Sequence, residues 1–386
     1  MAAVTSREAA VALASLPDMN PHRLRAIQQA FGFERGWQAV LDRRLARHPR
    51  TSRCLGDHPA ALQAQMAAAA KLIDPSGLLA AHTAAGVEVL LLGDDRYPAA
   101  LAADLEPPAV LFARGDLGIV VGRRVAVVGT RRCTRSGRLV ALEMGAELAQ
   151  AGVRVVSGLA LGIDGAAHEG ALRAVDGRPA PVVGVVGCGL DVVYPKRHTE
   201  LWQAVADRGL LVSEWPLGSA ALPWRFPLRN RIIAALAEVV VVVESHAAGG
   251  SLQTVEQATK RGRDVMVVPG SVRSPASRGT NALLFDGAGP ARHAADVLGV
   301  LGLTAPTSAD GSELVTVPAA DAPDTTLLPD ETDQELLDRL GGEPRTLDQL
   351  AADSGRDPAD LAVTLLRFEQ RGWIVRSGAW IERVAP

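Results

Sequence analysis

Lysine is almost absent from this sequence, since it supplies only three of the 40 basic residues and arginine supplies the other 37. The net charge is −3 over 386 residues, so the chain as a whole has no strong attraction for polyanions, membrane surfaces or acidic partners. Any anion site must therefore come from a local cluster of arginines, whose planar guanidinium groups bind oxyanions through paired hydrogen bonds.

Cysteine is also scarce. Cys54, Cys133 and Cys188 are odd in number, far apart and outside any C-x-x-C spacing, which excludes a disulfide framework and a cysteine zinc site. No grouping of histidine, cysteine and carboxylate has the spacing of metal ligands, so we expect no metal and no cofactor.

Long hydrophobic runs are missing as well. No apolar stretch approaches the roughly 20 residues of a membrane span. The first residues contain Glu8 and only a short apolar stretch before Pro17, which is unlike a secretory signal. We therefore expect a soluble, cytoplasmic protein that does not bind membranes.

The chain divides into segments that differ in pattern and charge. The net charge is +4 for residues 1–85, +2 for residues 86–305 and −9 for residues 306–386. We expect four parts: a small helical domain (1–85), a Rossmann-like core (86–302), a linker rich in Pro, Ala, Thr and Asp (303–329), and a winged-helix-like domain (330–386).

The first part contains two stretches of helical apolar spacing separated by the break LPDMNPHRL. This arrangement is typical of a helix-hairpin-helix, a SAM-like domain or a similar small bundle. Asp18 and Asn20 stand where a hairpin that grips a phosphate backbone has glycines. A packing or partner module is therefore favoured over a DNA-gripping hairpin.

From about residue 86, short apolar runs alternate with helical stretches. The runs are RVAVVG, VRVVSG, PVVGVVG, LLVSE, VVVVVE and DVMVVPG, and loops rich in glycine and small residues follow them. Strands apolar on both faces that alternate with helices indicate an α/β fold with a doubly wound, mostly parallel sheet. Ligands of such sheets bind at the carboxyl ends of the strands, so these loops are where function is expected.

The last part contains three short amphipathic helical stretches, followed by a hairpin that turns at Ser377 and Gly378. This pattern is typical of a winged helix. Arg367 and Arg371 lie four residues apart on the third helical stretch, but they share it with Glu369 in an acidic region. We expect this domain to dock a protein, or to fold back on basic loops as a nucleic-acid mimic, rather than to hold DNA.

The loop after the first core run reads GTRRCTRSGR, and six arginines but no acid lie between Arg123 and Arg138. Gly129 ends the strand and a helix is expected from about Ser136, which is the geometry of an anion site at a helix N-terminus. Neither a Walker loop nor a dinucleotide fingerprint is present. The structural alternative is a set of scattered surface arginines.

The second loop, SGLALGIDGAAH, begins with Ser157 and Gly158 at the end of a strand, and its glycines let backbone N–H groups approach a ligand. Asp164 and His168 are four residues apart, as in a metal pair or a general base. We expect a helix N-cap and a packed histidine there instead.

The third segment, PWRFPLRNRIIAAL, interleaves arginines with Trp224 and Phe226. Arginines beside exposed aromatic rings suit a polyanion with stackable bases, which is single-stranded nucleic acid. The alternative is that Phe226 is a core anchor and that one arginine pairs with Glu214 or Glu238.

The fourth loop, AAGGSLQTVE, leads from two glycines and Ser251 into a helix that carries Thr254, which again suits a phosphate. No nucleophile with an adjacent base is found in any of the four loops, so no catalytic residue is expected. The loops together favour a protein that binds over one that catalyses.

Read together, these loops resemble the DNA-processing protein A family, also called DprA or Smf. The resemblance runs in order over about residues 85–300 through DRYPAAL, the GTR loop, SGLALGIDGAAH, GCGLDVVYP, SEWP, FPLRNRIIA, VVVVE, GGSLQT, GRDVMVVPG and GTNALLFDGA. The sequence departs from the usual family pattern at Leu161, where the family has Arg, at His198, where it has Asn, and at Gly249, where it has Ser.

The resemblance implies a recombination mediator of natural transformation that binds single-stranded DNA without sequence preference and protects it. It also implies a homodimer that loads the RecA recombinase. The contacts carried over from the family are Arg131, Ser157, Gly158, Phe226, Arg229, Asn230, Arg231, Ser251 and Thr254. Secondary candidates are Gly129, Arg132, Arg135, Gly162, Trp224 and Gly250.

An enzymatic alternative remains, namely a nucleotide phosphoribohydrolase of the lysine-decarboxylase-like (LOG) type. Such enzymes have G-G-x-G-T-x-x-E, and GGSLQTVE keeps the glycines and the spacing to Glu256 but has Leu252 and Gln253 at the other positions. A structural or regulatory adaptor that acts through the acidic C-terminal part is the other alternative.

Overall fold

The computed structural model describes residues 4–175, 179–303, 331–340, 345–370, 373–377 and 380–383. The chain forms two compact units, Met1–Pro306 and Thr307–Pro386. Each unit has its own hydrophobic core, and each is described by itself below.

The first unit begins with a helical segment. Its helices are α1 (Ser6–Ala14), α2 (Pro21–Phe31), α3 (Phe33–Leu41), α4 (Pro49–Ser52), α5 (Pro59–Ala70) and α6 (Pro75–Ala84), with a 3-10 turn η1 (Leu45–Arg47). Thr5 and Glu8 form a capping box at the start of α1. The Asn20 side chain caps α2, and Pro21 occupies its first turn, so the predicted break between two helices is confirmed.

A nine-stranded sheet follows, with the order β1-β2-β6-β5-β4-β3-β7-β8-β9. The strands are β1 (Glu88–Leu91), β2 (Val110–Gly115), β3 (Arg124–Val128), β4 (Arg154–Ser157), β5 (Val182–Val186), β6 (Leu210–Ser213), β7 (Val239–Val242), β8 (Asp264–Val267) and β9 (Gly289–Pro290). β1 pairs with β2 and β2 with β6 in antiparallel fashion, while every pairing from β6 to β9 is parallel.

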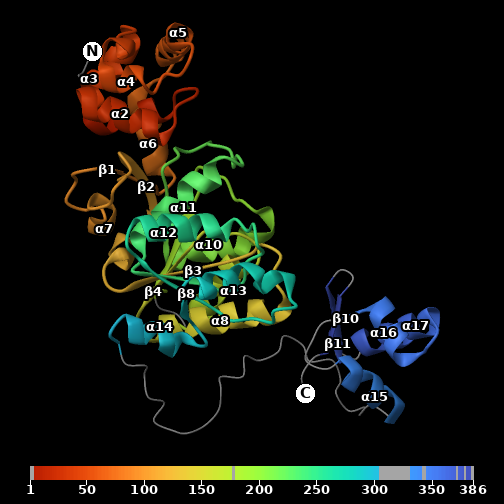
Figure 1. Ribbon diagram of the computed structural model, residues 1–386. Helices are drawn as coiled ribbons and strands as arrows, with labels where there is room; N and C mark the ends of the chain where they lie inside the picture. Colours follow the sequence, from red (N-terminus) through yellow and green to blue (C-terminus); the bar gives the residue numbers. More distant parts are fainter. Residues whose placement is uncertain are drawn as a thin grey trace. The chain divides into compact units, whose positions relative to one another are not determined.

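Helices cover both faces of this sheet (Figure 1). They are α7 (Ala99–Ala102), α8 (Arg135–Gln150), α9 (Ile163–Arg173), α10 (Thr199–Arg208), α11 (Arg225–Leu236), α12 (Ser251–Lys260), α13 (Arg278–Phe285) and α14 (Ala294–Val300), with 3-10 turns η2 (Leu117–Val120), η3 (Lys196–His198) and η4 (Pro275–Ser277). Alternate valines of the strands enter two cores: one contains α8, α9, α10 and α14, and the other contains α11 and α12.

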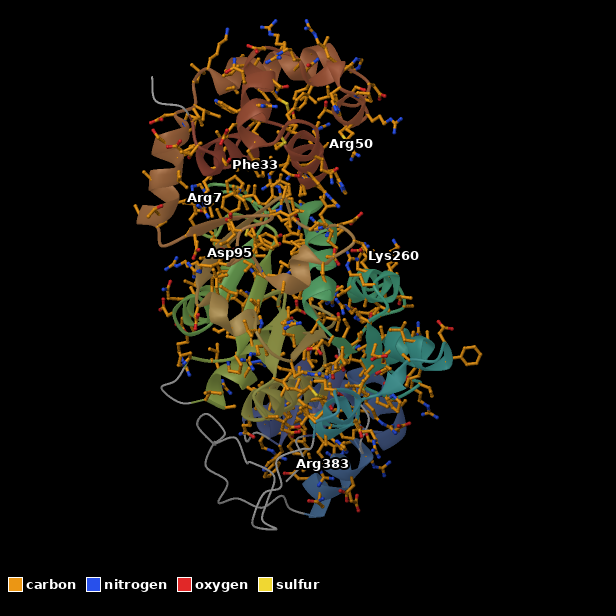
Figure 2. The ribbon with its side chains drawn as sticks, turned by 90° about the vertical axis from the view of Figure 1, so that its left-hand side faces the viewer. Arg7, Phe33, Arg50, Asp95, Lys260 and Arg383 are labelled. Carbon is orange, nitrogen blue, oxygen red and sulfur yellow. The ribbon has the colours of Figure 1, made fainter. Side chains whose placement is uncertain are left out.

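The helical segment packs on the antiparallel end of the sheet. Arg7 of α1, labelled in Figure 2, donates from Nε to the carbonyl of Val89 at 3.2 Å and pairs with Asp94 at 2.8 Å. The Leu217 N–H, in the loop after β6, donates to His82 Nε2 of α6 at 3.1 Å. These contacts join the first 84 residues to the sheet within one compact unit.

The second unit has the helix and strand order of a winged helix. Its elements are α15 (Glu331–Leu340), β10 (Arg345–Thr346), α16 (Leu347–Ser354), α17 (Pro358–Gln370), β11 (Ile374–Ser377) and β12 (Trp380–Arg383). The strands form a sheet of order β10-β12-β11. The expected linker, apart from its first residue, and also Arg371 and Gly378, lie outside the described residues.

The predicted fold class is confirmed: an α/β protein with a mostly parallel sheet, an N-terminal helical region and a C-terminal winged helix. The strands β1, β2, β9 and β10 were not predicted from the sequence. Within the described part of the chain, no helix is both long and apolar enough to cross a membrane.

Candidate nucleic-acid interface

The carboxyl ends of β3 to β8 form one edge of the sheet, and the loops that leave them carry the predicted site residues. β3 and β7 are neighbours, but the chain continues from β3 towards β4 on one side and from β7 towards β8 on the other. Such a reversal opens a crevice above the strand ends, where ligands of doubly wound sheets bind.

The loop after β3 is tied to the end of β7 by Glu244. The Thr130 N–H donates to the Glu244 carbonyl at 2.8 Å, and the Glu244 carboxylate accepts from the Thr134 N–H at 2.9 Å and from its hydroxyl at 2.6 Å. Thr134 is the N-cap of α8, and a Cβ on Gly137 would overlap the Glu244 carboxylate.

These contacts correct the prediction of an anion site at the start of this helix. The helix begins at Arg135, and the carboxylate of Glu244, which is only 8% exposed, lies against its first turn. The positive end of the helix is therefore satisfied from within the protein. A ligand would instead meet three exposed side chains of this loop, those of Arg131, Arg132 and Arg135.

A pocket at this edge, which we call the edge pocket, combines three of the predicted loops with the loop after β5. It is lined by Arg131, Gly158, Ala160, Leu161, Val186, Gly187, Cys188, Tyr194, Pro195, Phe226 and Arg229. Most of this lining is apolar or backbone, and its two charged side chains are both arginines.

Aromatic rings and a guanidinium group are layered at the edge pocket. The rings of Tyr194 and Phe226 are stacked, with centroids 5.3 Å apart and planes inclined by 25°. Arg131 lies over the Phe226 ring, with its Cζ 5.2 Å from the centroid. Tyr194 is 41% exposed, so its ring is accessible to solvent.

Arg229 is buried beneath this layer. Its guanidinium donates to the carbonyl of Val185, and its Nε has no hydrogen-bond partner in the described part of the chain. Burial lowers the pKa of Arg229 to about 10, against the opposing effect of Asp164, so the side chain remains charged at neutral pH. A Cβ on Gly158 would overlap this guanidinium, so glycine is needed there.

His168 is fully buried, as expected, but Asp164 is not the expected N-cap, because Gly162 is the N-cap of α9 and Asp164 lies within its first turn. The Gly158 N–H donates to Asp164 Oδ2 at 3.0 Å, and burial raises the pKa of Asp164 while Arg229 lowers it. Burial lowers the pKa of His168 to about 4, so its ring is neutral. No group of histidines, cysteines and carboxylates in the described ranges could hold a metal ion.

Six of the nine predicted contact residues are buried, namely Ser157, Gly158, Arg229, Arg231, Ser251 and Thr254. The Ser157 hydroxyl donates to the Val127 carbonyl at 2.6 Å, and the Ser251 hydroxyl donates to that of Ser245 at 2.9 Å. Arg231 pairs with Glu214, as the structural alternative for this segment held. Thr254 is 2% exposed. These contacts within the protein support the loops, and direct contact of Ser157, Arg231, Ser251 and Thr254 with DNA stays a prediction.

The remaining predicted residues are more accessible. Asn230, Gly129 and Gly162 are half-buried and Gly250 is exposed. Gly162 has a φ of 81°, and a Cβ there would overlap the Thr130 carbonyl, so it lets the second loop approach the first. Trp224 is 47% exposed but lines a different hollow, described below.

The departures from the family pattern also have places in the structure. Leu161 lines the edge pocket, so it puts an apolar side chain where the family usually has a cation. The His198 ring bonds through Nδ1 to the Leu159 carbonyl at 3.0 Å. A Cβ on Gly165 would overlap the His198 ring, so these two residues fit together.

Sequence reasoning missed Tyr194 and Glu244. Tyr194 lies in GCGLDVVYP, and an aromatic residue next to proline in a loop after a strand was a signal for it. Glu244 ends an apolar run, and a carboxylate at the carboxyl end of a central strand is also unusual. Glu256 is 61% exposed in its side chain and pairs with Lys260 at 2.6 Å, which gives the hydrolase alternative no support.

Two family models match this chain. The one for DNA recombination-mediator protein A covers residues 88–302, more than half of the chain, and the one for the DprA winged helix domain covers residues 317–379. Protein Smf of Escherichia coli is 35% identical over 285 residues, which are 72% of each chain. DNA processing protein DprA of Bacillus subtilis is 39% identical over 55% of this chain and 70% of that protein.

Solved structures agree with the sequence matches. DNA processing protein A from Streptococcus pneumoniae has a TM-score of 0.61 at 30% identity, covering 77% of this chain and 98% of that one. DNA processing protein A from Helicobacter pylori, described for its single-stranded DNA binding mode, has a TM-score of 0.50 at 29% identity, covering 56% and 95%. This chain therefore belongs to the DNA recombination-mediator protein A family, DprA/Smf, and carries the winged-helix domain of that family.

Proposed function

We propose that this chain binds single-stranded DNA at the edge pocket without sequence preference, protects it and passes it to the RecA recombinase. The observation that carries the proposal is the layer of Arg131, Phe226 and Tyr194 above the buried charge of Arg229. The single-stranded DNA binding mode described for the Helicobacter pylori relative supports it.

The chemistry of this layer suits an unpaired strand. Aromatic faces stack on any base, because every base has a π-face, and each such stack contributes about 1–3 kcal/mol. The guanidinium groups attract phosphates, again without regard to sequence. In duplex DNA the bases are covered by their neighbours, so Tyr194 and Phe226 would have nothing to stack on.

Fewer residues are proposed to contact the DNA directly than the sequence led us to expect. Arg131, Phe226, Arg229 and Tyr194 form the centre of the interface. Gly129, Arg132, Arg135, Gly162, Asn230 and Gly250 flank it. Ser157, Arg231, Ser251 and Thr254 hold the loops in place.

The test is a titration of labelled DNA measured by fluorescence anisotropy. A single-stranded 30-mer should bind at least tenfold more tightly than its duplex at equal ionic strength, and strands of different sequence should bind alike. The test variant is Phe226→Ala, which removes the aromatic ring but no charge and should weaken the binding of single-stranded DNA. Equal affinity for the single strand and the duplex would overturn the proposal.

We propose that the protein binds DNA and catalyses no reaction. We also propose that it acts in the cytoplasm, where RecA works on DNA. Incubation with AMP followed by chromatography tests for the hydrolase alternative, which requires that free adenine be released. Delivery to RecA is tested by whether the protein speeds RecA filament formation on single-stranded DNA that a binding protein already covers.

A homodimer is part of the same proposal. Phe285, at the end of α13, is 92% exposed, the highest fraction among the large hydrophobic side chains described. An exposed ring of this size is a common feature of a protein–protein interface. Phe285→Asp should shift the mass measured by light scattering from dimer to monomer, and an unchanged mass would remove this residue from the interface.

A further inference from the structure

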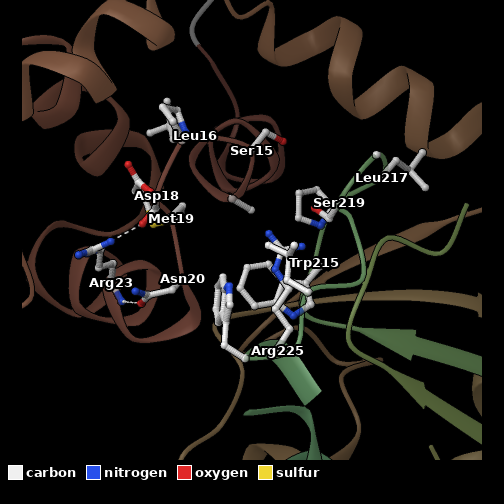
Figure 3. Close-up of a pocket in the computed structure, with 16 residues that line it drawn as sticks. Ser15, Leu16, Asp18, Met19, Asn20, Arg23, Trp215, Leu217, Ser219 and Arg225 are labelled. Atoms are coloured by element: carbon white, nitrogen blue, oxygen red, sulfur yellow. Dashed lines mark hydrogen bonds between the residues drawn. The ribbon is translucent and has the colours of Figure 1, made fainter. Parts of the chain in front are cut away.

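A hollow of the first unit lies between its helical segment and its sheet, and the proposed function leaves it unused. It has a volume of about 640 Å³, within the range of small-molecule sites. One wall is the α1–α2 connection with Arg23, and the other is formed by the loop after β6 and the start of α11. Figure 3 shows Asp18, Met19 and Asn20 across the hollow from Trp215 and Arg225.

Two tryptophans and an arginine form the sheet-side wall. The rings of Trp215 and Trp224 meet edge to face, with centroids 5.3 Å apart. The Arg225 guanidinium carbon lies 3.8 Å from the Trp215 centroid and 5.2 Å from that of Trp224. Trp215 is 4% exposed and Trp224 is 47% exposed, so Trp224 presents the accessible ring.

This wall is held rigidly. The Trp215 N–H donates to the Ser213 hydroxyl at 3.0 Å, which itself donates to the Cys188 carbonyl at 2.7 Å. Arg225 donates from Nη1 to the Ala220 carbonyl at 2.9 Å, and its buried Nε has no hydrogen-bond partner among the described residues. These hydrogen bonds fix Trp215 and Arg225, against which the Trp224 ring packs.

The hollow and the edge pocket share their dividing wall. Phe226 lines the edge pocket, and Trp224 and Arg225, which precede it directly, line the hollow. The loop after β5 lines the edge pocket and is also bonded to the wall of the hollow, because the Gly218 N–H donates to Asp191 Oδ1 at 2.9 Å. Two residues span at most about 7 Å, so a strand held on Phe226 reaches Trp224 within one or two nucleotides.

The chemistry of the hollow fits a base better than a phosphate. Leu16, Met19 and Leu222 contribute apolar surface. Arg23 already donates from Nε to the Cys54 carbonyl at 2.7 Å and from Nη1 to the Asp18 carbonyl, and Asp18 adds a negative charge. A flat ring with polar edges suits tryptophan, arginine and carboxamide neighbours, whereas a phosphate would meet two arginines that both already donate to backbone carbonyls.

We infer that this hollow is a second base-binding site for the strand that occupies the edge pocket, with Trp224 as its stacking face. The inference rests on the proposed function, to which it adds a second binding site for the same DNA strand. The strand runs from Tyr194 and Phe226 over the start of α11 and places a following base beside Trp224, Arg225 and the α1–α2 connection.

The test compares dT15, which offers bases to both sites, with a 15-mer that carries a single thymine among abasic sites and so offers a base to one site alone. Trp224→Ala should weaken binding of dT15 about tenfold, the loss of one base stack, and change that of the single-thymine strand less than twofold. Trp224→Phe should restore most of the loss. The matched control is Trp380→Ala, which removes an exposed tryptophan of the second unit and should leave both affinities unchanged.

The outcomes separate this inference from the proposed function. If Trp224→Ala weakens neither strand, or both equally, the second site is refuted while binding at the edge pocket stands. If free dTMP quenches Trp224 fluorescence as strongly as dT15 does, the hollow is an independent nucleotide site and the inference fails. If the wild-type protein binds neither strand, the proposed function itself has failed.

Discussion

At the scale of single residues, the edge pocket depends on two arginines in opposite environments. Arg131 is exposed and lies over an aromatic ring, while Arg229 is buried and is surrounded by backbone carbonyls and Asp164. A phosphate can approach the first without any change in the protein. The second shapes the floor of the pocket as well as its charge, so the two substitutions should have different effects.

Arg131→Ala should weaken single-stranded DNA binding uniformly across sequences and lower the slope of log K against log salt by about 1. The loss of one phosphate contact accounts for both effects. The measurement is a set of anisotropy titrations between 50 and about 300 mM salt. Arg173→Ala, an exposed arginine in the last turn of α9, is the control and should leave the slope unchanged.

Arg229→Ala should reduce stability as well as DNA binding. Its removal leaves the buried Asp164 without the opposing charge that favours its ionised form, at a cost on the order of 3 kcal/mol. Urea unfolding measures this loss. Asp164→Asn added to Arg229→Ala should recover part of the stability but none of the DNA binding, and a double variant less stable than the single one would contradict the argument.

His168 should make stability depend on pH in the acid range. Its pKa is about 4 in the folded protein and about 6.5 in the unfolded chain, so the unfolded state binds more protons as the pH falls. The stability is fully present above pH 6.5, and about 3 kcal/mol is lost by pH 4. His168→Leu should flatten this part of the profile of unfolding free energy, whereas His22→Gln, an exposed histidine, should not.

At the scale of elements, the sequence predicted the parallel strands well because their valine runs are buried on both faces. It did not predict β1 and β2, which are short, antiparallel and separated by residues 92–109 without a regular period. The sequence predicted the individual loops of the edge pocket, but it did not predict which side chains of these loops contact one another. Glu244 and Thr134 are 110 residues apart, and no local pattern shows that one will cap the helix of the other.

Gly137→Ala tests the junction between β7 and α8. The new methyl group would overlap the Glu244 carboxylate, which two hydrogen bonds to Thr134 hold in place. We expect a loss of about 2 kcal/mol in unfolding free energy together with weaker DNA binding. Gly299→Ala in α14, where a Cβ would meet nothing within 4 Å, is the matched control and should be tolerated.

At the scale of the whole molecule, charge separates the two units. The second unit belongs to the segment of charge −9, and its third helix presents apolar side chains outward, with Val363 70% and Leu366 51% exposed. On the same helix Arg367 pairs with Asp333 at 2.5 Å, so this arginine is engaged within the unit. These features favour a protein partner over a phosphate backbone.

Deletion of residues 306–386 should therefore leave the affinity for single-stranded DNA unchanged, or raise it at low salt. The long-range repulsion from the acidic unit is removed, while the edge pocket lies entirely in the first unit. Anisotropy titrations of both proteins at low and high salt measure the effect. A truncated protein that binds several-fold more weakly would show that the winged helix grips DNA.

The carboxylate of Glu244 at the start of α8 has a consequence for the rate at which DNA bound at the edge pocket would dissociate. A strand seated on a bare helix end would leave an unsatisfied dipole behind each time it departed, which slows release. Here that end is neutralised permanently, so a strand bound as we propose would rest on Arg131, Arg229 and the stacked rings without the helix dipole. A strand bound in this way would exchange quickly and be displaced by a competitor, which is the property that the proposed transfer of DNA to a second protein requires.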